Sequence, residues 1–138
     1  MALDVQLLRD SFQLVLERHP APTARFYEIL FEQYPAARAL FRRNSRKNQE
    51  AMLAQALVAV LDHLDDGAWL EGTLGALGEK HAGYGVTREM YDWVGGALIA
   101  TFAEIAGKDW TPAHTEAWGT AYGIIASIML RGEAHAAE

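Results

Sequence analysis

Apolar side chains recur along this chain at intervals of three and four residues, which is the period of an α-helix. The clearest example is the series Leu70, Leu74, Leu77 and His81. Its spacings of four, three and four keep these side chains within one narrow sector of a helix. No segment alternates apolar and polar residues in the manner of a strand, so we expect one all-α domain over residues 1–138.

Start and stop signals divide the pattern into six or seven helices. Asp4 is a candidate N-cap, Pro22 and Pro112 suit a first helical turn, Thr87 is a further cap, and Gly107 is a natural stop. Residues 42–48 are polar and basic, which predicts a loop, and residues 65–67 and 82–85 predict two turns. The predicted helices cover residues 4–18, 22–34, 49–64, 69–81, 88–106 and 112–133, with a short helical turn over 35–41.

The composition of the chain argues against several classes of function. Of the 138 residues, 51% are hydrophobic, which is enough for a substantial core, and the formal net charge is −6. Because this charge repels phosphate backbones, we expect no nucleic-acid partner. The absence of cysteine excludes disulfides and cysteine-ligated metal sites. The N-terminus does not resemble a signal peptide, and the nearly apolar stretch 51–61 is too short to span a bilayer, so we expect a cytoplasmic protein.

His81 is the residue that decides the chemistry. An imidazole on a leucine stripe needs a polar partner, because burying an unsatisfied polar group is costly. A single histidine in such a place is more often a satisfied core residue than a ligand. A neutral imidazole in a dry, helix-walled pocket is nevertheless a good iron ligand. The remaining histidines show no mutual metal-ligand spacing.

Several short strings occur in an order that resembles bacterial single-domain globins of the Vitreoscilla type and the globin domain of flavohaemoglobins. The resemblance covers nearly the whole chain, and the joint spacing is far more specific than any one residue. We expect no reductase domains of the flavohaemoglobin kind. The strings are Phe26-Tyr27, Pro35 to Phe41, Gln49-x-x-x-Leu53, Lys80-His81, Tyr91, and Ala117-Trp118-Gly119-x-Ala121-Tyr122-Gly123.

The resemblance implies a globin fold of six to seven helices around a haem b pocket, with His81 as the proximal iron ligand. It implies distal ligand contacts from Tyr27, Gln49 and Leu53, although Asn48 competes with Gln49 for its place. Tyr91 and Glu133 fill the positions of a proximal network with His81, which the resemblance implies to be catalytic. The implied haem contacts are Phe26, Phe41, Leu57, Lys80, Val94, Leu98 and Tyr122.

Most of these residues also have an ordinary structural interpretation. Tyr27 alone is more often a core tyrosine, and Gln49 alone is most often a solvated helix residue. Tyr91 and Glu133 could be unrelated to each other. Lys80 is a candidate partner for a haem propionate. Three arginines of the basic segment are weaker candidates, because such a segment is usually just solvated; they are Arg42, Arg43 and Arg46.

The resemblance implies reversible, high-affinity dioxygen binding, with carbon monoxide and nitric oxide as further ligands. Hydrogen-bond donors at Tyr27 and Gln49 would each stabilise bound dioxygen by roughly 1 kcal/mol and slow its release. A proximal carboxylate and phenol would raise the basicity of His81 and favour redox work. The alternative is therefore nitric oxide dioxygenation, or a peroxidase-like activity, with an external reductase.

Two further classes are weaker: a sensor or cofactor-free interaction module, and a six-coordinate globin, which is disfavoured because no histidine falls at the distal position. We expect a monomer or a homodimer.

Overall fold

The computed structural model describes residues 4–41, 45–83 and 86–137, with the side chains of residues 40, 41 and 133–137 outside the description. This part of the chain is built of helices and short 3₁₀ turns and contains no strand, which confirms the all-α prediction. The elements are α1 (Val5–Arg18), α2 (Pro22–Gln33), η1 (Pro35–Phe41), α3 (Arg46–Asp62), α4 (Gly67–Gly83), α5 (Arg88–Ala106), η2 (Gly107–Asp109) and α6 (Pro112–Ala137).

Most of the predicted start and stop signals act as expected. The Asp4 carboxylate accepts a hydrogen bond from the backbone N–H of Leu7 at 3.0 Å, which satisfies one exposed donor of α1. Pro22 lies in the first turn of α2, where its missing N–H costs nothing. Gly107 ends α5 with a φ of +57°, a conformation that favours glycine.

Three predicted boundaries were wrong. The loop predicted over 42–48 ends early, because Ser45 caps α3 by accepting from the backbone N–H of Asn48 at 3.2 Å. α4 spans residues 67–83 instead of 69–81, and the Asp66 carboxylate accepts from the N–H of Trp69 in its first turn. α6 continues four residues beyond Glu133. In each case good helix formers or a local cap extend the helix past the apolar stripe.

The larger of two apolar clusters joins α1, α2, α3, α5 and the first half of α6. The rings of Phe12, Phe102 and Trp118 contact one another edge-on or tilted at its centre. The indole N–H of Trp118 donates to the Ser11 hydroxyl at 2.8 Å, so the buried polar atom is satisfied. The other members that matter for the site are Phe26, Tyr27, Leu98 and, half-buried against them, Leu53, Leu57 and Val94.

The smaller cluster lies between α4, the start of α5 and the second half of α6, and its buried members are Leu70, Leu74, Tyr91, Ile128 and Met129. Here the helix backbones approach closely. A Cβ atom on Gly78 would lie 2.7 Å from the Met129 carbonyl carbon, and one on Gly132 would lie 3.0 Å from that of Gly75. Glycine is required at such an approach because any side chain would enter the partner backbone.

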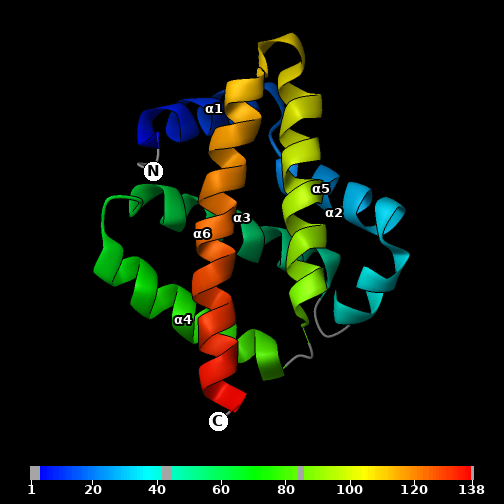
Figure 1. The fold of residues 1–138 in the computed structure, drawn as a ribbon. Coiled ribbons are helices and arrows are strands. Elements are labelled where there is room, and N and C mark those ends of the chain that lie inside the picture. Colours follow the sequence, from blue (N-terminus) through cyan, green and yellow to red (C-terminus); the bar gives the residue numbers. More distant parts are fainter. Residues whose placement is uncertain (1–3, 42–44, 84–85, 138) are drawn as a thin grey trace.

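Figure 1 shows how these helices are arranged: α5 and α6 run side by side, and α4 crosses the C-terminal half of α6. Among the described residues, no helix is long and apolar enough to cross a membrane.

Candidate functional site

His81 lies near the end of α4, half-buried, with its ring in contact with Tyr91 across a centroid distance of 6.2 Å. Its Nδ1 atom is 2.8 Å from the backbone carbonyl oxygen of Leu77. A carbonyl oxygen can only accept, so Nδ1 carries the proton and the lone pair of the neutral ring lies on Nε2. The local helix thus selects the tautomer that an iron atom requires.

The same tautomer occurs at His63, whose Nδ1 lies 2.7 Å from the carbonyl of Ala59. The two histidines differ in what surrounds them. The face of the His63 ring is stacked on Trp69 at 3.9 Å. His81 instead lies beside the smaller cluster, with Leu77 of its own helix packed against that cluster. Surroundings therefore single out His81.

Two tyrosines support the His81 side of the site. Tyr91 is only 6% exposed, and the Tyr122 hydroxyl donates to its backbone carbonyl at 2.5 Å. The Tyr122 ring lies over Gly95, where an added Cβ would come within 2.6 Å of it. Burial raises the pKa of the Tyr122 phenol, so it stays a neutral donor. Glu133 belongs to α6, but its side chain lies outside the described residues.

Tyr27 lies on α2, is 3% exposed and belongs to the larger cluster. Its hydroxyl donates to the backbone carbonyl of Gln49 at 3.4 Å, which is long for an O–H···O bond. Burial raises the pKa of the phenol to about 12, partly opposed by the positive charge of Arg46 and reinforced by Glu50. The hydroxyl is therefore neutral near pH 7.

The structure brings Gln49 and Leu53 to the same side as Tyr27. Gln49 is half-buried, whereas the neighbouring Asn48 is exposed and uses its backbone N–H for the Ser45 cap. Burial favours Gln49 over Asn48 as the inward-facing residue. Leu53 and Leu57 follow on α3 at spacings of four and pack against the larger cluster.

The other predicted contact residues are distributed around these two sides. Phe26 and Leu98 are buried in the larger cluster, and Val94 packs against it. Lys80 is exposed, as a residue paired with a solvent-facing group would be. Phe41 is the last residue of η1, and its side chain lies outside the description.

The sequence analysis placed Arg46 in a loop, and this placement was wrong. Arg46 begins α3, and its exposed side chain lays the guanidinium over the rings of Tyr27 and Phe31. The signal that could have located it is the Ser45 cap, which starts the helix at Arg46, three residues before the predicted start, and puts Arg46 one turn before Glu50. Arg42 and Arg43 lie outside the described residues.

The two sides of the candidate site meet where the two apolar clusters adjoin. The Tyr27 side belongs to the larger cluster and the His81 side to the smaller, and the half-buried Val60 packs against both. A nitrogen lone pair on one wall and neutral donors on the other suit a flat iron cofactor with one protein ligand and one open position. The residues present therefore fit haem.

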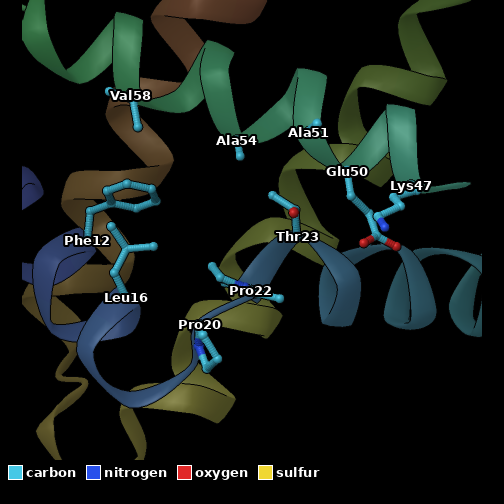
Figure 2. A pocket seen from close by; sticks show the side chains of 11 residues that line it. Phe12, Leu16, Pro20, Pro22, Thr23, Lys47, Glu50, Ala51, Ala54 and Val58 are labelled. Atoms are coloured by element: carbon cyan, nitrogen blue, oxygen red, sulfur yellow. The ribbon is translucent and has the colours of Figure 1, made fainter.

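A hollow lies between α1, α2 and the face of α3 that is turned toward them, and Figure 2 shows it from close by. Its volume is about 270 Å³. Apolar side chains such as Phe12, Leu16 and Val58 form one end, and Lys47 and Glu50 border the other. No residue predicted for the site lines this groove.

Comparison with known proteins gives one consistent result. The family model described as Globin matches residues 24–129. A flavohemoprotein of Pseudomonas putida is 34% identical over 130 residues, which cover 92% of this chain and 33% of that protein. The chain thus spans about a third of the length of the curated relatives it matches.

Solved structures agree. An engineered carbene transferase, built from a Rhodothermus marinus protein provisionally named a nitric oxide dioxygenase, superposes with a TM-score of 0.82 at 30% identity, covering 95% of this chain and 91% of that one. A flavohemoglobin of Malassezia yamatoensis with bound FAD and haem superposes with a TM-score of 0.76 at 25% identity, covering 95% of this chain and 36% of that one. The predicted globin fold is confirmed.

Proposed function

Because this chain belongs to the globin family, we propose that it binds haem b between its two apolar clusters and binds dioxygen there reversibly. His81 Nε2 is the proposed iron ligand, and Tyr27 and Gln49 face the opposite side of the haem. When bound, haem supplies an iron atom with one position open to a diatomic gas.

The observation that carries this proposal is the hydrogen bond from His81 Nδ1 to the Leu77 carbonyl at 2.8 Å. It holds the ring in one tautomer and one orientation, with the Nε2 lone pair as the donor. A structural histidine elsewhere in the chain, His63, makes the same bond but is covered by an indole. Among the histidines that the structure describes, only His81 combines this tautomer with a ring contact to Tyr91 of the smaller cluster.

On the opposite side, Tyr27 supports the binding of a diatomic ligand. Its pKa of about 12 keeps the O–H donor intact at neutral pH. Its bond to the Gln49 carbonyl, at 3.4 Å, is long and places the hydroxyl next to Gln49, the other proposed distal residue. The side-chain amide of Gln49 is the second proposed donor, and Leu53 the apolar contact between them.

The proximal network is the second part of the proposal. Tyr91 is in ring contact with His81, and Glu133 follows on the helix that crosses α4. We propose that this pair increases electron donation from the imidazole to iron. Apolar contacts to the macrocycle come from Phe26, Phe41, Leu57, Val94, Leu98 and Tyr122, and Lys80 pairs with a propionate.

A second candidate function is nitric oxide dioxygenation, and the relatives favour it. Flavohemoproteins match over nearly all of this chain, and the R. marinus parent protein is named for that reaction. In this chain the role would need a reductase partner to keep the iron ferrous. A single turnover with nitric oxide does not distinguish this role from dioxygen binding. Sustained nitric oxide consumption with a cellular reductase and reduced nicotinamide does.

The main test replaces the imidazole. We expect His81→Gly to lose its haem absorption bands and to regain them when free imidazole is added, because the small base can occupy the vacated space. The matched control is His63→Gly, which removes the same type of hydrogen bond at a residue stacked on Trp69. If His81→Gly takes up haem like the wild type without imidazole, the proposal is wrong.

A further inference from the structure

Arg46, in the first turn of α3, contacts α2 beside Tyr27. Gln49, the other proposed distal donor, follows in the same part of α3. We infer that Arg46 is a positioning residue, whose guanidinium sets the separation between the Tyr27 hydroxyl and Gln49. This inference rests on the proposed function, since Tyr27 and Gln49 matter only if they face a ligand.

Arg46 makes contacts with both helices at once. Its Cζ atom lies 5.5 Å from the centroid of the Tyr27 ring and 5.4 Å from that of Phe31, within the range of cation–π attraction. Its Nη2 donates to the Ala24 carbonyl at 3.1 Å, which ties it to the first turn of α2. Its Nε lies 3.1 Å from a carboxylate oxygen of Glu50, one turn further along α3.

These contacts need an arginine and not merely a positive charge. The guanidinium presents a flat face to the two rings while separate N–H groups at its edge reach Ala24 and Glu50. The ammonium of a lysine is a single point and cannot meet both rings and both acceptors. Because Tyr27 and Phe31 are themselves in ring contact at 5.8 Å, the face of the guanidinium covers both at one time.

The groove of Figure 2 opens beside this contact, bordered by Glu50 and lined by the small side chains of Thr23, Ala51 and Ala54. The Tyr27 hydroxyl also donates to the Gln49 carbonyl at 3.4 Å, across the same pair of helices. Arg46 thus joins the turn of α3 that carries Gln49 to the ring of Tyr27 and to the backbone of α2.

The test uses the haem-loaded protein and two readouts. The first is the stretching frequency of carbon monoxide in the ferrous complex, which rises when a hydrogen-bond donor near the ligand is lost or moved. The second is amide hydrogen exchange of Gln49, whose N–H bonds to the Ser45 carbonyl in the first turn of α3. We expect Arg46→Met to raise the frequency, in the same direction as Tyr27→Phe, and to speed exchange roughly tenfold.

Arg46→Lys should rescue neither readout fully, because it keeps the charge but not the planar fork. The matched control is Arg38→Met: its guanidinium also lies 5.4 Å over Phe31, but it belongs to η1 and not to α3. We expect both readouts to stay at wild-type values in that control.

The results for these variants distinguish the distal role of Tyr27 from the positioning role of Arg46. If Tyr27→Phe itself leaves the frequency unchanged, the distal role of Tyr27 in the proposed function fails. If Tyr27→Phe shifts the frequency and Arg46→Met does not, the inference is overturned while the proposed function stands. Faster exchange without a frequency shift would make Arg46 a purely structural residue, which also overturns it.

Discussion

The contact between α4 and α6 offers the sharpest test of the fold, because it depends on single glycines. In Gly78→Ala the new Cβ would lie 2.7 Å from the Met129 carbonyl carbon and 2.8 Å from its Cα. Carbon atoms in van der Waals contact stay about 3.5 Å apart, so the helices would have to separate by roughly 0.8 Å. Both atoms are backbone, so no side chain can turn aside.

The expected cost follows from two opposing effects. Overpacking costs about 1–3 kcal/mol. Replacing glycine by alanine in a helix interior returns about 0.5–1 kcal/mol. With backbone on both sides of the contact, we expect Gly78→Ala to lower the free energy of unfolding by about 1–2 kcal/mol. Because His81 follows one turn later on α4, the same displacement should weaken haem retention.

Gly72→Ala is the matched control on the same helix, since nothing lies within 4 Å of its Cβ position. This variant should gain about 0.5–1 kcal/mol from helix propensity alone. Urea unfolding of the two variants should therefore differ by about 2–3 kcal/mol, and their melting temperatures by roughly 5–10 °C. Equal stability of the two variants would show that α4 and α6 do not approach closely at Gly78.

Three further changes test other contacts. Ser11→Ala should cost about 1–3 kcal/mol in urea unfolding, because it leaves the buried indole N–H of Trp118 without its acceptor; wild-type stability would contradict this. Glu104, paired with Arg25 at 2.7 Å, has its pKa lowered mainly by that hydrogen bond. Its stabilisation is present above the usual carboxyl pKa and is lost as pH falls through the lowered value. Glu104→Gln should therefore cost under about 1 kcal/mol at neutral pH and nothing in acid. Tyr27, with its pKa raised to about 12 by burial, stabilises the fold below its unfolded pKa of about 10, and this is lost as pH rises toward 12. Tyr27→Phe should show a shallower alkaline fall in unfolding midpoint than the wild type.

Periodicity predicted the helices well where a helix buries an apolar stripe. Leu8, Phe12 and Val15 in α1, and Leu70 and Leu74 in α4, are all buried as the spacing required. Helix ends were less predictable, because they depend on single hydrogen bonds such as the Ser45 cap, which apolar spacing does not record.

The candidate site also combines features that the sequence predicts with one that it does not. The spacing of Gln49 and Leu53 follows from helix geometry, and so does the presence of His81 on a stripe. The contact of Arg46 with two rings of α2 does not, because it joins segments about twenty residues apart through the angle between two helices. No pattern within either helix predicts that angle.

The glycines of α4 show how the structure decides between readings that a sequence leaves open. Their spacing permits close approach by a neighbouring helix or by a flat ligand. At Gly78 the approaching group is the α6 backbone at Met129, and the Gly75 carbonyl lies against Gly132, whereas Gly72 has nothing near it. The helix that carries His81 is thus placed by close backbone contact as well as by the side chains of the smaller cluster. Such a contact tolerates little adjustment. The packing of α4 on α6 therefore fixes the position of the imidazole before any ligand is bound.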